Sequence, residues 1–217
     1  MTMTSRPRPP FVPMLLALAA VLAGVGGYAA WLAAKAPPSF LGTVYEPAPA
    51  ADFRLVDQDG RPATLATYRG RPVLLFFGFT KCADYCPATL DRLARAVREL
   101  GGKAGGAQVL LVTVDPANDT PAALKEYLAR FEGRVTGLTG DTAALGAAWR
   151  GYSVYVAPAA AGHHGGAGHH PPSAAPAQLN HSGVVYGIDR DGDLRVVITE
   201  GARLEAIKHD IRALARL

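Results

Sequence analysis

The sequence predicts an α/β fold, a mixed sheet flanked by helices, preceded by one helix that crosses a membrane. Three observations lead to this prediction. Two continuous apolar runs, residues 72–80 and 107–115, look like buried parallel strands, and a helical pattern follows each of them. A later segment, residues 183–199, is typical of a β-hairpin that turns at Asp191-Gly192. An uncharged apolar run occupies residues 11–34.

The N-terminal apolar run is expected to be a transmembrane anchor. As a helix, residues 11–34 would be about 36 Å long, against a hydrocarbon core of roughly 30 Å. Arg6 and Arg8 precede the run, and cationic flanks stay in the cytoplasm, so residues 1–10 are expected to be cytoplasmic. A cleaved signal peptide is the alternative, because residues 34–36 resemble a cleavage site, but Pro37 and the length of the run favour the anchor.

The globular domain is expected to span residues 47–217, after a Pro/Ala-rich tether at residues 35–46. Asp59-Gly60 marks a turn between two short extended runs. After the first long strand, apolar residues recur at helical spacing, namely Leu90, Leu93, Ala94, Val97 and Leu100. The second long strand leads to a helix over residues 120–131, with Thr120 as its N-cap.

The rest of the domain supplies a third helix over residues 141–154, the late hairpin and a final amphipathic helix over residues 204–217. The early β-α-β unit implies parallel pairing, and the hairpin adds antiparallel strands. This order, with a cysteine pair after the first long strand, describes a thioredoxin-like fold. Residues 157–179 are rich in Gly, Ala, Pro and His without apolar periodicity, which predicts a flexible insertion.

The charge distribution argues against a nucleic-acid partner. The net charge is +4, but Arg6, Arg8 and Lys35 all precede residue 37, where no acidic residue occurs. The remaining chain carries 19 basic and 18 acidic residues, so the domain is almost neutral. A neutral domain without a basic stripe does not predict binding to DNA or RNA.

The chain has only two cysteines, Cys82 and Cys86, in the stretch FFGFTKCADYCPATL. At i and i+4, across a loop and a first helical turn, both sulfurs can converge on one point. A helix N-terminus is expected to favour the thiolate form. Two thiolates form a soft site that suits copper, with a third ligand from elsewhere. His181, just before the late hairpin, is the candidate, although a histidine at such a junction is commonly a surface or capping residue.

The motifs together resemble the SCO/SenC family of copper chaperones for cytochrome c oxidase. The cysteine stretch is similar to the family's F-G-[YF]-T-x-C-x-x-x-C-P-x-x-L. VLLVTVDPANDTPAALKEYLARF is similar to its V-[ST]-V-D-P-x-x-D-T-P segment, and NHSGVVYGIDRDG to its D-H-S and hairpin. The resemblance covers about residues 47–217 and includes the single N-terminal span.

The resemblance implies copper, as Cu(I) or Cu(II), bound by Cys82, Cys86 and His181. It implies delivery to the dinuclear copper site of cytochrome c oxidase subunit II, with another periplasmic copper chaperone as a further partner. The protein would be a chaperone rather than an enzyme. The short N-terminus has no Arg/Ser-rich transit segment, which favours a bacterial inner-membrane protein with its C-terminal domain in the periplasm.

The chain departs from the family pattern beside the expected ligands. Lys81 stands where His is frequent, Ala83 where Pro is frequent, and Asn180 where the family has Asp. Asn180 can still hydrogen-bond to a ligand imidazole but supplies no charge, and the Lys81 cation would favour a thiolate. Asp115, in the V-D-P motif, is expected either to act on the electrostatics of the site or to serve as a turn residue at the strand end.

Four further histidines lie in the expected insertion: His163, His164, His169 and His170. Imidazole binds copper(II), zinc and nickel, so the segment is either an auxiliary metal site or a solvated low-complexity loop.

Two functions compete with copper delivery. A thiol–disulfide oxidoreductase that keeps the cysteines of the oxidase copper site reduced would need only Cys82 and Cys86 as a redox-active pair. A peroxidase of the peroxiredoxin type is compatible with the fold, but the closely spaced second cysteine argues against it.

Overall fold

The computed structural model describes residues 11–35, 38–156 and 183–217 of the 217-residue chain. The chain divides into two compact units, Met1–Pro38 and Ser39–Leu217. The first contains helix α1, Phe11–Lys35, which was expected over residues 11–34. Within α1, Pro13–Leu32 is long and apolar enough to cross a membrane, with a mean hydropathy of 1.9 and none of its surface buried.

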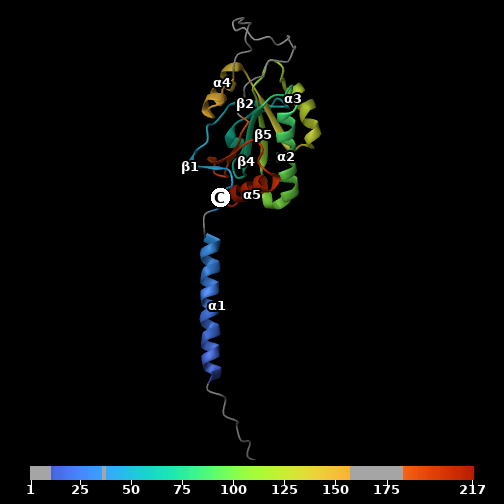
Figure 1. The fold of residues 1–217 in the computed structure, drawn as a ribbon. Coiled ribbons are helices and arrows are strands. Elements are labelled where there is room, and N and C mark those ends of the chain that lie inside the picture. Colours follow the sequence, from blue (N-terminus) through green and yellow to red (C-terminus); the bar gives the residue numbers. More distant parts are fainter. Residues whose placement is uncertain (1–10, 36–37, 157–182) are drawn as a thin grey trace, which may run out of the picture. The chain divides into compact units, whose positions relative to one another are not determined.

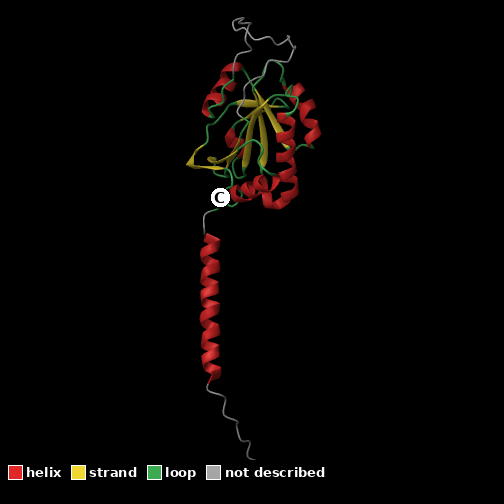
Figure 2. Cartoon of the chain, viewed as in Figure 1, coloured by secondary structure: helices red, strands yellow, loops and turns green. Residues whose placement is uncertain are grey.

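The second unit is built on a mixed sheet flanked by helices, as the sequence predicts (Figures 1 and 2). In the described part of the chain the strand order is β1-β8-β7-β4-β5-β6-β2-β3. The strands are β1 (Thr43–Pro49), β2 (Leu55–Asp57), β3 (Pro62–Ala63), β4 (Val73–Gly78), β5 (Gln108–Thr113), β6 (Val135–Thr139), β7 (Val185–Ile188) and β8 (Asp193–Ile198). The helices are α2 (Tyr85–Leu100), α3 (Pro121–Leu128), α4 (Thr142–Gly151) and α5 (Leu204–Leu214), with short 3-10 turns η1 (Leu65–Tyr68), η2 (Gly101–Ala104) and η3 (Ala129–Phe131).

Strand β4 lies at the centre of the sheet and all of its residues are buried. It pairs in parallel with β5, which pairs in parallel with β6, whereas β7 lies antiparallel on the other side of β4. Phe76 of β4 stands opposite Val185 of β7. The chain leaving β4 therefore runs beside the chain entering β7, which brings residues far apart in the sequence to one edge of the sheet.

Two strands were not predicted. Strand β6 contains Gly137, which weakens any strand pattern, yet the glycine lets the strand approach α3 closely: a Cβ there would lie 2.6 Å from Leu128 Cδ1. Strand β1 begins at Thr43, inside the segment predicted to be a tether, and pairs antiparallel with β8. Ahead of β1, the backbone N–H groups of Leu41 and Gly42 donate to the buried Asp210 carboxylate at 2.7 and 3.0 Å.

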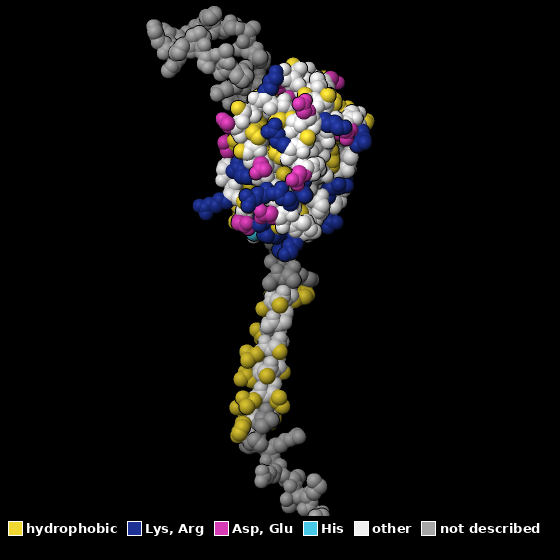
Figure 3. Space-filling view, turned by 90° about the vertical axis from the view of Figure 1, so that its right-hand side faces the viewer, with side chains coloured by type: hydrophobic (Ala, Val, Ile, Leu, Met, Phe, Trp, Pro, Cys, Tyr) yellow, Lys and Arg dark blue, Asp and Glu magenta, His cyan; other side chains and the backbone are white. Residues whose placement is uncertain are grey.

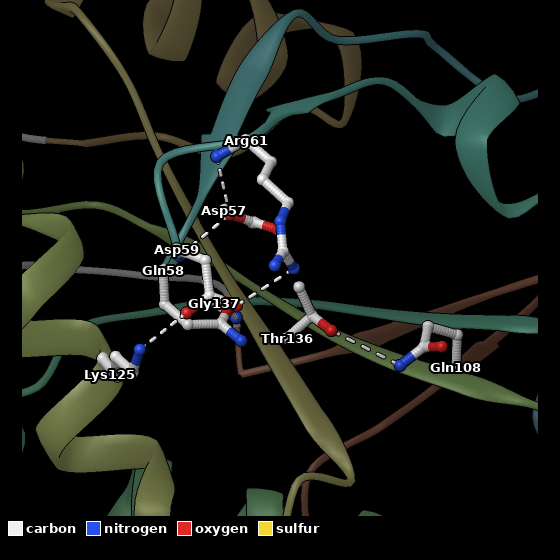
Figure 4. Close-up of polar contacts among 8 residues, drawn as sticks. All are labelled: Asp57, Gln58, Asp59, Arg61, Gln108, Lys125, Thr136 and Gly137. Atoms are coloured by element: carbon white, nitrogen blue, oxygen red, sulfur yellow. Dashed lines mark hydrogen bonds and ion pairs between the residues drawn. The ribbon is translucent and has the colours of Figure 1, made fainter.

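The turn between β2 and β3 is attached to the neighbouring elements by side chains (Figure 4). The Asp57 carboxylate accepts from the backbone N–H of Asp59 at 2.8 Å, which closes the expected turn. Asp59 pairs with Lys125 of α3 at 2.9 Å, and Gln58 accepts from the N–H of Gly137 at 2.9 Å. These contacts hold α3 against the edge of the sheet.

An aromatic cluster connects the end of α4 to β7. The Tyr186 hydroxyl donates to the backbone oxygen of Tyr152 at 2.6 Å, and the two rings meet edge to face at 5.0 Å. Phe77 contacts both rings, at 5.4 and 6.0 Å. The cluster fixes the chain on both sides of residues 157–182, which lie outside the described part.

Acidic and basic side chains are interspersed on the face of the second unit that Figure 3 shows, whereas apolar side chains cover α1. The mixed surface agrees with the almost neutral charge of residues 36–217. A helix that is apolar all round is typical of a segment surrounded by lipid.

Candidate metal centre

The two cysteines lie where the chain leaves β4 and enters α2. The N–H of Cys82 donates to the backbone oxygen of Phe79 at 3.3 Å, and the N–H of Cys86 donates to the Cys82 sulfur at 3.3 Å. The two cysteines are not joined by a disulfide bond. The i, i+4 spacing therefore spans a loop and the first helical turn, with the Cys82 sulfur against the start of α2.

The two thiols differ in exposure. Cys82 is half-buried, whereas Cys86 is fully buried. Behind Cys86 the sulfur lies against β4, where a Cβ added at Gly78 would be only 2.9 Å from it. Of the two thiols, Cys82 is therefore the more accessible, and Cys86 lies behind it in the core.

The expected lowering of thiol pKa at the helix N-terminus is not found at Cys86. Burial raises the pKa of the Cys86 thiol, and the neighbouring Cys82 and Asp119 act in the same direction. The hydrogen bond with the Phe79 backbone opposes them but is outweighed. The prediction took the helix N-terminus into account but not the surrounding core. Burial of the Cys86 thiol in that core is the largest influence on its pKa.

A buried carboxylate, Asp119, ties the cysteine loop to the end of β5. It accepts from the Thr80 N–H at 3.2 Å, from the Thr80 hydroxyl at 2.5 Å and from the Thr113 hydroxyl at 2.6 Å. Burial raises the pKa of Asp119, and the hydrogen bonds from the two threonines oppose that shift. In DPANDTP only Asp115 was predicted to act at the site; the sequence signal for Asp119 is its position directly before the helix N-cap Thr120.

Asp115 and Lys81 are joined through Asn118. The Asn118 side-chain amide donates to the Asp115 carboxylate at 2.8 Å, and its oxygen accepts a hydrogen bond from the Lys81 ammonium group. The Asp115 backbone oxygen accepts from the N–H groups of Asn118 and Asp119 at 3.1 and 2.9 Å. The described contacts of Asp115 are thus those of a turn residue, and Lys81 is linked to this turn through Asn118.

The remaining predicted site residues lie outside the described residues: His163, His164, His169, His170, Asn180 and His181. Accordingly, no group of three metal-binding side chains is present within residues 11–35, 38–156 and 183–217. Gly183, two positions after His181, does lie at the cysteine loop, because its backbone oxygen accepts a hydrogen bond from the hydroxyl of Tyr85. Tyr85 is the first residue of α2 and directly precedes Cys86.

Two mitochondrial proteins with curated descriptions are similar to this chain over about two thirds of its length or more. The chain is 41% identical over 151 residues to the bovine mitochondrial SCO2 homolog, covering 65% of this chain and 56% of that protein. It is 34% identical over 169 residues to mitochondrial SCO2 of Saccharomyces cerevisiae, covering 74% of this chain and 52% of that protein. The chain thus spans about half the length of these two curated relatives.

Solved structures agree with the fold. The copper-bound structure of Bradyrhizobium japonicum ScoI superimposes with a TM-score of 0.63 at 30% identity, covering 77% of this chain and 99% of that one. The sequence matches the SCO1/SenC family over residues 44–216, which include β1 and both cysteines. From the mixed sheet, the cysteine loop and this match, we conclude that the chain belongs to the SCO1/SenC family.

Proposed function

We propose that this protein binds copper through Cys82, Cys86 and His181 and delivers it to the dinuclear copper site of cytochrome c oxidase subunit II. The observation that carries the proposal is the hydrogen bond from Tyr85 to Gly183, which brings the chain next to His181 to the loop that holds both thiols. The copper in the related ScoI structure supports the choice of metal.

The donor set suits a metal that must be passed on. Two thiolates and one imidazole match the preferences of copper(I) and copper(II), and both thiols lose their protons when the metal binds. Because Cys86 is fully buried and Cys82 is half-buried, a thiol of the acceptor reaches the metal beside Cys82. Ligand exchange would start there, with Cys86 released last.

Thiol–disulfide reduction is the second candidate function, and the accessible Cys82 beside the Cys86 N–H favours it. The Cys82 thiolate would attack a disulfide of the acceptor and form a mixed disulfide. Cys86 would then displace the acceptor sulfur, so that the acceptor gains two electrons and the protons of its thiols. Residues 82 and 86 would end as a disulfide.

We also propose the placement of the domains. Residues 11–34 anchor the protein in a bacterial inner membrane, residues 1–10 lie in the cytoplasm, and the copper domain lies in the periplasm. The apolar helix α1 and the positions of Arg6 and Arg8 support this orientation.

Copper titration of His181→Ala tests the ligand set. Reduced wild-type protein given one equivalent of copper(II) should show thiolate-to-copper charge-transfer absorption. His181→Ala should bind copper at least about tenfold more weakly, because losing a ligand should cost no less than losing a residue that only hydrogen-bonds to a ligand. His209→Ala is the matched control, because His209 contacts Asp210 on α5.

Three outcomes separate the alternatives. Absence of charge-transfer bands in the wild type, together with a dithiol redox couple, would favour the reductase. Equal affinity of the wild type and His181→Ala would remove His181 from the ligand set. An equal loss in His209→Ala would show that the effect is not specific to the site.

A further inference from the structure

Three cationic residues line one open hollow at the end of α5. Lys103 comes from η2, Arg212 from the last turn of α5, and Arg216 from just beyond that helix. The hollow has a volume of about 290 Å³. Helix α5 and the end of α2, which leads into η2, lie side by side at one end of the second unit (Figure 1). We call Lys103, Arg212 and Arg216 the basic patch.

The charges of the basic patch are not neutralised within the described part of the chain. Among those residues, none of the three side chains takes part in an ion pair or a side-chain hydrogen bond. Lys208 on the same helix differs, because Glu99 and Glu205 hold it at 3.0 and 2.9 Å. Like charges that face one hollow repel each other, and an anion from outside the domain would relieve that repulsion.

The covalent chain keeps the basic patch close to the end of α1. Leu41 is six positions after Lys35, the last residue of α1, and a fully extended chain covers at most about 22 Å over six residues. The Leu41 N–H donates to Asp210 of α5 at 2.7 Å. At 1.5 Å per residue, Asp210 lies within about 10 Å of Arg212 and Arg216 along the helix axis. A membrane that contains α1 would therefore have its headgroups near the patch.

The basic patch and the thiols lie at opposite ends of β4. A Cβ added at Gly105, which lines the hollow, would be 3.6 Å from Pro72 Cδ, and Pro72 directly precedes β4. Cys82 follows the other end of β4, and a strand of this length rises about 20 Å. A domain that rests on its basic patch would therefore present the cysteine loop on the side facing away from that contact.

We propose that Lys103, Arg212 and Arg216 form a docking surface for the phosphate groups of anionic phospholipids, which holds the domain on the bilayer with its cysteine loop turned away from the lipid. This inference rests on the proposed membrane anchoring of residues 11–34 and is independent of copper. Each Lys or Arg near an anionic membrane raises the ratio of docked to undocked protein about fivefold. The exposed side chain of Leu41 adds an apolar group beside the same surface.

Amine crosslinking to lipid tests the proposal in the full-length protein. The protein is reconstituted in vesicles of phosphatidylcholine and phosphatidylethanolamine, with or without phosphatidylglycerol. A membrane-permeable bifunctional ester joins lysines to phosphatidylethanolamine, and mass spectrometry measures the adduct at each lysine, relative to its reaction with a monofunctional ester. Lys103 should exceed Lys81, which precedes Cys82, and Lys125 of α3 several-fold. Omitting phosphatidylglycerol or raising the salt concentration should remove most of this excess.

A pair of double variants assigns the effect to the basic patch. Arg212→Gln combined with Arg216→Gln should lower the Lys103 adduct several-fold, towards the level of Lys125. Arg54→Gln combined with Arg150→Gln is the matched control, because it removes the same charge from exposed positions outside the patch. The control should keep the wild-type yield. If the Arg212 and Arg216 variant fails to fold, the comparison of wild-type protein with and without phosphatidylglycerol still decides.

The possible failures are distinct. A Lys103 yield no higher than that of Lys81, in protein that resists alkaline carbonate extraction, would overturn the docking surface and leave the anchor in place. An equal Lys103 yield without phosphatidylglycerol would show that the tether alone brings it to the lipid, and would overturn the role of the charges. Release of the protein by alkaline carbonate would instead overturn the anchor itself, and this inference with it.

Discussion

At the scale of single residues, the position of the cysteine loop depends on residues that are not copper ligands in the proposed site. Asp119 receives hydrogen bonds from both Thr80 and Thr113 and so fixes the loop relative to β5. Gly78 leaves room for the Cys86 sulfur against β4. The position of the thiols is therefore set by residues two to four positions before the pair and by a carboxylate far along the chain.

Asp119→Asn is expected to destabilise the protein by about 2 kcal/mol. The amide keeps one acceptor, but its NH₂ group faces hydroxyl and amide donors that then lose their partner. Urea unfolding at neutral pH measures the change, and Asp91→Asn, at an exposed position of α2, is the control. Equal stability of Asp119→Asn and the wild type would contradict the role given to this network.

Residue identities allowed the thiol pair and its i, i+4 arrangement to be predicted, because both lie in one short stretch. The pKa of Cys86 was predicted wrongly, since burial depends on what β4 and β5 place behind the sulfur.

At the scale of elements, the contact between α2 and α5 combines an apolar seam with surface ion pairs. Leu93 of α2 and Ile211 of α5 belong to the common buried core. At the surface, Lys208 of α5 pairs with Glu99 of α2 at 3.0 Å. Because apolar side chains make most of this contact, the Lys208–Glu99 ion pair is expected to add only modestly to the free energy of unfolding, by an amount that depends on pH.

The substitution Glu99→Gln should reveal how much the Lys208–Glu99 ion pair contributes to stability. Hydrogen bonds from Arg95 and Lys208 lower the pKa of Glu99 below its ordinary value of 4.5. The stabilisation is thus present above pH 4.5 and is lost as the pH falls through the lower, folded-state pKa. Denaturant unfolding should show wild type slightly more stable than Glu99→Gln at pH 7, with the gap closing in acid. A gap that grows on acidification would refute this assignment.

The long buried strands and the capped helices were the predictable elements. Strands β4 and β5 are continuous apolar runs, and the Thr120 side chain caps α3 as its position before Pro121 suggests. Strand β1 was missed because the sequence TVYEPAP contains two prolines and every one of its residues is exposed, so no alternation marks a buried face. The position of β1 is set by its pairing with β8, and this long-range pairing cannot be predicted from the local sequence.

At the scale of the whole molecule, residues 157–182 interrupt the domain between two fixed points. On one side, Tyr152 is held by the Tyr186 hydroxyl, and on the other, Gly183 is held by Tyr85. The domain core and its sheet are complete without this segment among the described residues. Changes within the segment should therefore leave the fold intact.

Deletion of residues 162–170 tests whether the histidines of this segment feed the copper site. The melting temperature should stay within about 2 °C of the wild type, since changes away from the core have small effects on stability. If the segment is an auxiliary metal site, copper(II) stoichiometry and the rate of loading should both fall. Unchanged stoichiometry and loading rate would leave the solvated loop as the correct description.

The close contact at Gly78 limits how this chain can vary during evolution. Even alanine there would place a Cβ 2.8 Å from the Phe76 ring, 2.9 Å from the Cys86 sulfur and 3.2 Å from Leu111. Three neighbours would have to move at once, so no single second substitution can compensate. Single substitutions at position 78 are thus not expected to be tolerated. Related chains that keep the Cys86 thiol in its buried position are expected to keep Gly78 as well.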